Sequence, residues 1–208
     1  MKRSTFFMSV GVLSLSAPTW SSDNYEISER GYWIGEVPEC HAFDGVLAQA
    51  IANFFIEEQA QAVVDFGCGT GAYVAHLRKS GISAEGYDGN PETAALSSGI
   101  GKVLDLSQPV HLDAVDWVMS LEVGEHLPKQ YETTFIENLM RHAKKGIVLS
   151  WAVKGQGGTG HFNEQDNDYI KAIFAKQGYI NDLGAETQLR EKAQCGWFAR
   201  SLMVFRKP

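Results

Sequence analysis

The spacing of apolar positions changes from a helical to a strand pattern within the first third of the chain. From residue 43 onward apolar residues recur at steps of three and four, which predicts a helix with one buried face; they are Phe43, Val46, Leu47, Ala50, Ile51, Phe54 and Phe55. The run Ala62-Val63-Val64-Asp65-Phe66 then stops at a cluster of glycines. A short apolar run that ends in this way is typical of a buried strand.

The same alternation continues to the end of the chain. Gly81 and Gly178 follow two predicted helices and are typical left-handed stops, while Asn90 and Pro91 suit the cap and first position of another. Strands that alternate with helices indicate a parallel α/β sheet with helices on both faces. We expect helices over 72–80, 91–98, 128–143 and 165–177, and strands over 82–87, 102–104, 114–119, 146–151 and 197–205.

Composition narrows the class of protein. A chain of 208 residues predicts one compact domain, and 44% hydrophobic with 21% charged residues is ordinary for a globular protein. No run of about eighteen apolar residues occurs, so we expect no spanning helix. The 18 basic residues against 25 acidic ones give a net charge of −7, which argues against a nucleic-acid partner and leaves a small molecule as the expected partner. The sequence gives no oligomeric state.

The cysteines and the amino terminus bear on location. Cys40, Cys68 and Cys195 are odd in number and widely spaced, so we expect reduced, mostly buried thiols and neither a disulfide framework nor a zinc site. A basic start and a short apolar stretch make residues 1–24 a leader or signal-like segment, although the cleavage site is poor. We expect a cytoplasmic protein, or an exported one if residues 1–20 act as a signal. Residues 25–60 are interpreted as an amino-terminal helical and lid segment, and 61–208 as the core domain.

The strongest local signal is the turn after the first core strand. Gly67, Gly69 and Gly71 stand at alternating positions between that strand and the next helix. Glycine permits positive φ and a close approach of ligand to backbone, and the start of a helix offers free N–H groups. A nucleoside-type cofactor therefore fits this place in an α/β sheet. A tight turn without ligand is the alternative, and Gly67-x-Gly69-x-x-Ala72 also satisfies the loose dinucleotide fingerprint.

Four segments in order carry a resemblance to a known family. The segment Asp65-Phe66-Gly67-Cys68-Gly69-Thr70-Gly71 resembles the first motif of class I S-adenosylmethionine-dependent methyltransferases. Segments 86–90, 103–106 and 116–128, the last containing SLEVGEHLP, resemble later motifs of the small-molecule branch, so that the likeness spans residues 62–151. The resemblance implies a Rossmann-like, seven-stranded, mostly parallel sheet with helices on both faces and an antiparallel C-terminal strand. It also implies S-adenosylmethionine as cofactor and an oxygen or nitrogen of a small molecule as acceptor.

The resemblance also implies which residues bind the cofactor. A carboxylate at Asp88 accepts from both ribose hydroxyls, unless it serves only the turn before Gly89. Asp105 accepts from the adenine amine or caps the next segment. Asp65 accepts from N–H groups of the loop or faces the amino group of the cofactor. The expected cofactor-binding residues are Asp65, Gly67, Cys68, Gly69, Gly71, Asp88, Gly89, Asp105, Leu106, Ser120 and Leu121.

Acidic and imidazole side chains gather after the fourth strand of the family pattern. Glu122, Glu125 and His126 lie within five positions, and His161 follows the next strand. They suit a general base, divalent-metal ligands or a hydrogen-bonded helix entry. The set is similar to that of small-RNA 3′-end 2′-O-methyltransferases and some quinone-precursor O-methyltransferases, in which a Glu-x-x-Glu-His segment helps hold a cation. We take all four as candidate catalytic residues and assign no metal ligand.

Two segments suit a lid over the acceptor. The glycine-rich stretch 154–164 is a mobile lid or a plain connection, and Tyr32, Trp33 and His41 are lid residues or packing aromatics. Alternative functions are a metal-assisted RNA 2′-O-methyltransferase, an inactive cofactor-binding module and a nicotinamide-linked oxidoreductase.

Overall fold

The computed structural model describes residues 25–35 and 43–208. The predicted leader, Cys40 and the candidate lid residue His41 lie outside the described residues. The segment predicted as helical and lid-like begins with an antiparallel hairpin, in which β1 (Tyr25–Ile27) pairs with β2 (Trp33–Gly35). The helix α1 (Gly45–Glu57) follows, and the carboxylate of Asp44 caps its first turn by accepting from the N–H of Leu47 at 2.9 Å.

A second sheet holds seven strands and confirms the predicted fold class. Its order is β5-β4-β3-β6-β7-β9-β8, and β9 runs antiparallel to both of its neighbours while the pairs from β5 to β7 are parallel. The strands are β3 (Ala62–Phe66), β4 (Ser83–Asp88), β5 (Gly101–Val103), β6 (Val115–Leu121), β7 (Ala143–Ser150), β8 (Ile180–Asn181) and β9 (Leu202–Arg206).

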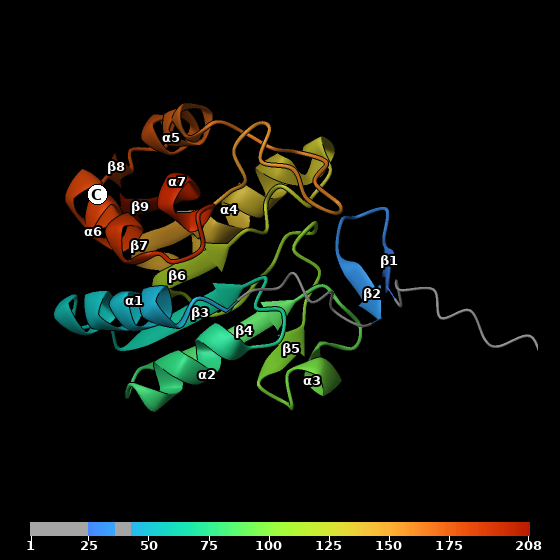
Figure 1. Ribbon diagram of the computed structural model, residues 1–208, viewed down its shortest axis with the longest axis horizontal. Helices are drawn as coiled ribbons and strands as arrows, with labels where there is room; N and C mark the ends of the chain where they lie inside the picture. Colours follow the sequence, from blue (N-terminus) through green and yellow to red (C-terminus); the bar gives the residue numbers. More distant parts are fainter. Residues whose placement is uncertain (1–24, 36–42) are drawn as a thin grey trace, which may run out of the picture.

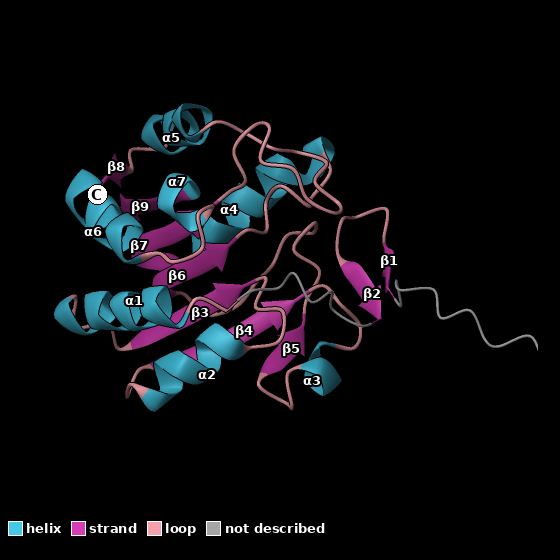
Figure 2. Cartoon of the chain, in the orientation of Figure 1, coloured by secondary structure: helices cyan, strands magenta, loops and turns pink. Residues whose placement is uncertain are grey.

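Helices cover both faces of this sheet (Figure 1, Figure 2). A short 3₁₀ turn at Lys129–Tyr131 precedes α4, where a continuous helix is expected from residue 128. Gly81 ends the second helix with φ +85°, as predicted. The remaining helices are α2 (Ala72–Lys79), α3 (Thr93–Leu96), α4 (Glu132–His142), α5 (Asn167–Lys176), α6 (Leu183–Lys192) and α7 (Phe198–Ser201).

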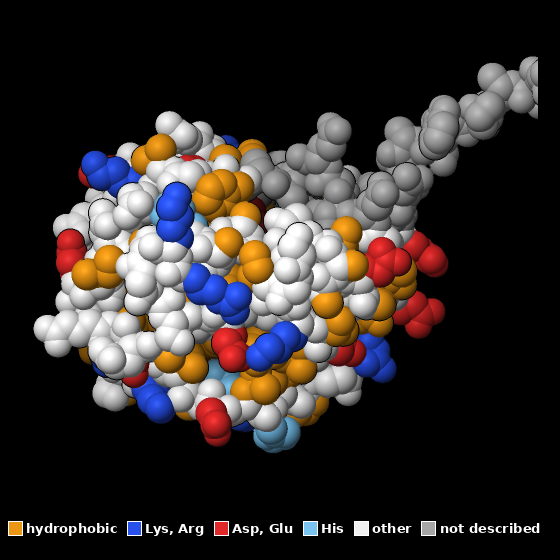
Figure 3. Space-filling view, turned by 90° about the horizontal axis from the view of Figure 1, so that it is seen from below, with side chains coloured by type: hydrophobic (Ala, Val, Ile, Leu, Met, Phe, Trp, Pro, Cys, Tyr) orange, Lys and Arg blue, Asp and Glu red, His pale blue; other side chains and the backbone are white. Residues whose placement is uncertain are grey.

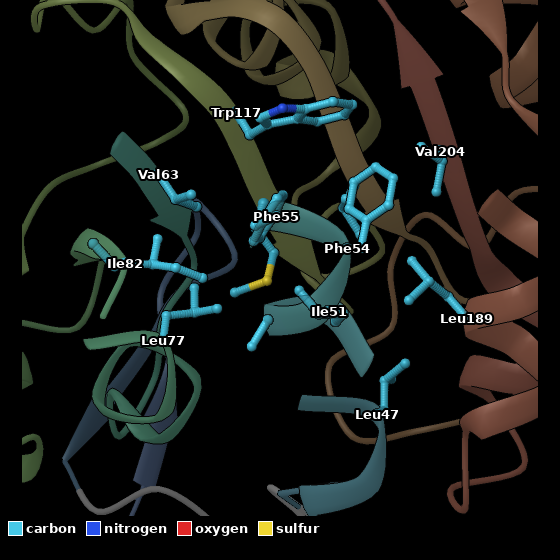
Figure 4. Packing of buried hydrophobic residues seen from close by; sticks show 14 of the residues in the cluster. Leu47, Ile51, Phe54, Phe55, Val63, Leu77, Ile82, Trp117, Leu189 and Val204 are labelled. Atoms are coloured by element: carbon cyan, nitrogen blue, oxygen red, sulfur yellow. The ribbon is translucent and has the colours of Figure 1, made fainter. Parts of the chain in front are cut away.

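Alternating side chains of the strands divide the interior into two cores. Val63 and Trp117 belong to one core, which α1, α2 and α6 cover, while their chain neighbours Val64 and Val118 belong to the other, beneath α4 and α5. Figure 4 shows the first core, where Phe54 and Phe55 of α1 lie against Trp117 with ring centroids 5.0 and 5.9 Å away. Strands apolar on both faces are what a parallel sheet between two helical layers requires.

Three differences from the sequence-based expectations stand out near the carboxyl end. The predicted strand 197–205 is wrong in its first half, because Phe198–Ser201 is a helical turn and the strand begins at Leu202. The helix α6 and the two-residue strand β8 are not predicted. Cys68 is buried as expected, whereas Cys195 is only half-buried. Among the described residues, no helix has the length and apolar character that crossing a bilayer demands.

Candidate functional site

The glycine turn after β3 is held by the end of β4. The N–H groups of Gly67 and Cys68 both donate to the carbonyl oxygen of Tyr87, at 2.7 and 3.0 Å. The carboxylate of Asp88 then accepts from the N–H of Gly69 and from the N–H of Asn90, each at 2.9 Å. One carboxylate therefore binds the turns that follow two adjacent strands, and it lies on the wall of a cavity.

Two of the glycines are required by packing as well as by backbone conformation. Gly67 and Gly71 have φ of +86° and +74°, a region that side chains disfavour. A β-carbon on Gly67 would lie 2.2 Å from a methyl group of Val123, and one on Gly71 would lie 2.8 Å from a methyl group of Ile100. Gly71 precedes α2 and does not line the cavities described below, so it shapes the turn.

Asp65 is a buried carboxylate that faces open space. Its side chain is 4% exposed and receives no hydrogen bond from a described residue, although it lines a cavity. Burial, together with the nearby charge of Asp88, raises the pKa of Asp65 to about 8. A cationic group placed in that cavity would favour the ionised form of Asp65.

Two adjoining cavities lie at the carboxyl ends of the parallel strands. The first is bounded by the ends of β4 and β5 and by the hairpin, and the second by α2, the glycine-rich loop and the segment before β9. Residues common to both walls mark where they meet: Trp33, Gly67, Gly69, Glu122 and His126. A ligand that filled both would pass the glycine turn and the acidic segment after β6.

The hairpin forms one wall of the first cavity. Arg30 pairs with Asp105, whose other oxygen accepts from the N–H and the hydroxyl of Ser107. Burial alone would raise the pKa of Asp105, but hydrogen bonds from Ser107 and Arg30 hold it below its ordinary value. Tyr32 packs closely on Gly89, since a β-carbon added to Gly89 would lie 2.6 Å from the β-carbon of Tyr32. The expected adenine-binding carboxylate is thus engaged by the hairpin.

Glu125, His126 and His161 come together between β6 and the glycine-rich loop. Each offers a ligand atom, and these atoms lie within 4.8 Å of one another. Glu125 is fully buried, and neither of its carboxylate oxygens has a hydrogen bond of ordinary geometry from a residue that the structure describes. Burial, followed by the charge of Glu122, raises the pKa of Glu125 well above 4.5. A divalent cation would give this buried carboxylate a partner, so the residues present fit such an ion.

The two imidazoles of this cluster are oriented by oxygen atoms. Nδ1 of His126 lies 3.1 Å from the carbonyl oxygen of Gly160, and Nδ1 of His161 lies 2.9 Å from a carboxylate oxygen of Glu164. The two rings meet edge to face with centroids 4.9 Å apart. An acceptor at Nδ1 selects the tautomer whose lone pair is on Nε2, as in histidines that bind metals or act as bases.

Glu122 is held in a strained conformation at the junction of the cavities. Its φ of +53° is left-handed, which a residue other than glycine seldom adopts. Its carboxylate accepts from Nε2 of Gln156 at 2.6 Å and from the hydroxyl of Ser201 at 2.8 Å. The helical turn α7 thus brings Ser201 from the far end of the chain to the site.

The candidate residues from sequence divide into those that line the cavities and those that support them. Ser120 is buried, and its hydroxyl donates to the carbonyl oxygen of Phe66 at 2.6 Å, so it joins β6 to β3 and lines neither cavity. Cys68 contributes its backbone, because its side chain is buried and the sulfur packs toward Gly86; burial also raises the pKa of this thiol. Residues on the cavity walls are Asp65, Gly67, Cys68, Gly69, Asp88, Gly89, Asp105, Leu106, Leu121, Glu122, His126 and His161.

Sequence reasoning missed several residues of the site. Four residues that contact candidate residues were not predicted: Arg30, Val123, Gln156 and Ser201. Of these four, Val123 alone lies in a segment that carried the resemblance to the methyltransferase family. Arg30 and Gln156 lie in segments predicted to cover the acceptor, which was the signal available for them, whereas Ser201 lies in a segment predicted as a strand and carried no such signal.

Comparison with known proteins points to one family. A family described as "Methyltransferase domain" matches residues 41–151. No match was found among the curated proteins. Magnesium protoporphyrin IX methyltransferase from Synechocystis PCC 6803, with bound SAH, has a similar structure, with a TM-score of 0.63 at 17% identity over 84% of this chain and 89% of that one.

Two further solved structures share the architecture. The methyltransferase domain of bacterial CtHen1 has a TM-score of 0.56 at 15% identity, over 78% of this chain and 98% of that one. CalS10, an amino pentose methyltransferase from Micromonospora echinaspora, has a TM-score of 0.57 at 15% identity, over 77% and 90%. At such identities the likeness establishes the fold.

Proposed function

Because the chain belongs to the family of methyltransferase domains, we propose that it transfers a methyl group from S-adenosylmethionine to an oxygen or a nitrogen of a small molecule. The observation that carries the proposal is the pair of adjoining cavities that meet at the glycine turn, with Asp88 on one wall and Asp65 on the other. Solved proteins of the same fold are described with bound SAM or SAH.

The first cavity suits the nucleoside half of the cofactor. Asp88 offers two oxygens to the ribose hydroxyls. The oxygen that now accepts from the Gly69 N–H would either lose that bond to a ribose hydroxyl or accept from both groups. Asp105 and the backbone beside Leu106 would be available to the edge of the adenine once Arg30 releases its ion pair with Asp105. The hairpin would then cover the nucleoside and exclude water from it.

The second cavity suits the amino-acid half of the cofactor and the acceptor. The ammonium group would give Asp65 the positive partner that no described residue supplies. Placing the two halves on either side of the glycine turn puts the sulfonium beside the junction, where Glu122 and His126 stand. The acceptor would therefore enter from the side of the glycine-rich loop.

The bound cofactor supplies a methyl group that is already activated by a positively charged sulfur. An oxygen or nitrogen that accepted this methyl group would have to lose its proton to a base. The chain provides orientation, exclusion of water and a proton acceptor. His126, His161 and Glu122 are the candidates for that last role, because they border the cavity from which the acceptor approaches.

A small acceptor is favoured over nucleic acid by charge. The chain carries 18 basic against 25 acidic residues. On the face shown in Figure 3, Lys and Arg side chains are scattered among acidic and apolar ones instead of forming one continuous basic patch. The direct test incubates the protein with methyl-labelled S-adenosylmethionine and fractions of small hydroxyl and amine compounds, with short RNA as a separate arm. Label in a small product supports the proposal, and label in RNA alone contradicts it.

A second candidate function is metal-assisted methylation of a hydroxyl. The cluster of Glu125, His126 and His161 favours it, because a cation there would satisfy Glu125 and lower the pKa of a hydroxyl bound beside it. The test is titration with Mn²⁺ of the wild type, of Glu125→Gln and of Glu137→Gln, an exposed control on α4. Binding that falls at least about tenfold only in Glu125→Gln supports a metal site, and wild type that binds no Mn²⁺ removes it.

A further inference from the structure

We infer that Glu164 is a positioning residue, which closes the glycine-rich loop 154–160 over the acceptor side of the site and presents His161 to it in a single tautomer. The inference rests on the proposed function, because it concerns the side of the site from which the acceptor would approach. Glu164 itself lines neither cavity, so it acts through the groups that it holds.

The carboxylate of Glu164 binds three nitrogen atoms, two in the first half of the loop and one just after it. One oxygen of Glu164 accepts from the N–H of Gly155 at 2.8 Å, and the other accepts from the N–H of Gly157 at 2.7 Å and lies 2.9 Å from Nδ1 of His161. Gly155 and Gly157 have φ of +83° and +72°, which lets successive N–H groups converge on one anion. The loop is therefore wrapped around a single side chain.

The base of the loop is independently anchored. The N–H groups of Phe162 and Asn163 both donate to the carbonyl oxygen of Glu125, at 2.8 and 2.9 Å, and the indole N–H of Trp151 donates to the carbonyl oxygen of Asn163 at 2.7 Å. The Glu164 backbone is thus fixed beside the acidic segment. In the glycine portion, the carbonyl oxygen of Gly160 lies 3.1 Å from Nδ1 of His126, while the N–H groups of Gly155 and Gly157 donate to the Glu164 side chain. The position of residues 155–157 therefore depends on Glu164.

The consequence of this arrangement reaches two site residues. An anion at Nδ1 of His161 retains the proton there and leaves the lone pair on Nε2, on the edge of the ring away from Glu164. Closure of the loop also brings Gln156 to Glu122, where it donates at 2.6 Å. Loss of Glu164 would release both contacts together, because Glu164 binds the N–H groups on either side of Gln156 as well as the ring of His161.

Hydrogen exchange and imidazole ¹⁵N NMR on the full chain, without cofactor, test this role. In Glu164→Gln one oxygen remains and an NH₂ group opposes the loop N–H groups, so exchange at Gly155 and Gly157 should accelerate at least about tenfold. His161 should change from one tautomer to a mixture. The matched control is Asp166→Asn, which removes a charge from an exposed pair with Lys154 on the same loop and should change neither signal.

Glu164→Asp is a second variant in case Glu164→Gln does not fold. It keeps the negative charge, but its shorter side chain reaches fewer of the three donors. Accelerated exchange and a mixed tautomer in either folded variant support the role. Protection and tautomer that stay as in the wild type overturn it, as does a wild type that already shows mixed tautomers. None of these signals needs the cofactor, so a failure here is separate from a failure to bind S-adenosylhomocysteine.

Discussion

A methyl group of Val123 occupies the space that a β-carbon on Gly67 would need, 2.2 Å from its position. Gly67 follows β3 directly, and Val123 belongs to the acidic segment after β6. The two segments therefore pack in contact only because residue 67 has no side chain. The close packing explains why the glycine is needed even in the absence of any ligand.

Gly67→Ala should therefore lower the free energy of unfolding by about 2–4 kcal/mol, through positive φ and the clash with Val123. Gly81→Ala is the matched control, since φ there is +85° but nothing lies within 4 Å of the added carbon; it should cost only about 1–2 kcal/mol. Denaturant unfolding measures both. The double variant Gly67→Ala with Val123→Ala should recover part of the difference, and no recovery would show that the clash is unimportant.

Much of the fold follows from periodicity, and the failures have physical causes. The buried strands around Val64 and Val118 were predicted because parallel strands covered on both faces read as continuous apolar runs. The run that begins at Trp197 has the same appearance, yet its first turn is helical, since a short apolar run does not distinguish the two states. The helix α6 buries only Ala185, Glu186 and Leu189, too few to produce an apolar stripe.

Asp65 should make stability depend on pH in an unusual direction. Its pKa in the folded protein is about 8, above the ordinary 3.8, so between these values the folded state holds a proton that the unfolded chain has lost. Stability from this group is full below about pH 4 and is lost as the pH rises through 8. Asp65→Asn cannot ionise, so its Tm should exceed that of the wild type by at least about 5 °C at pH 9 and differ little at pH 4.

Calorimetry at several pH values measures this difference, with the exposed Asp113→Asn as control. A Tm for Asp65→Asn that is lower than the wild-type Tm at pH 9 would mean that Asp65 has a stabilising partner. The same variant should bind S-adenosylhomocysteine less tightly, because it cannot pair with the ammonium group.

Arg30→Ala should change the rates of cofactor exchange. The pair of Arg30 with Asp105 holds the hairpin over the first cavity. The two side chains are 45% and 27% exposed, so loss of the pair should leave the fold intact. We expect association and dissociation of S-adenosylhomocysteine to become several-fold faster, with Kd within about threefold of wild type because Asp105 is freed for the adenine. Stopped-flow tryptophan fluorescence reports both rates, and Arg30→Lys should be intermediate. Unchanged rates in Arg30→Ala would mean that the hairpin does not gate the cavity.

The candidate site could be predicted where its residues lie in short sequence motifs at the ends of neighbouring strands. Asp65 and Asp88 stand at the ends of adjacent strands, and the carboxyl ends of parallel strands meet at one edge, so their convergence needs no long-range information. Arg30 acts on a residue 75 positions away, and Ser201 on one 79 positions away. No local pattern encodes such pairs. The candidate roles of all these residues in binding and catalysis stay predictions.

The most direct measurement is isothermal titration of the wild type, Asp88→Asn and the exposed control Asp113→Asn with S-adenosylhomocysteine. The proposed site predicts micromolar binding by the wild type and Asp113→Asn, and binding weaker by about tenfold or more in Asp88→Asn, which loses one charged acceptor. Binding that is equal in all three proteins, or a wild type that binds a nicotinamide dinucleotide instead, would contradict the account.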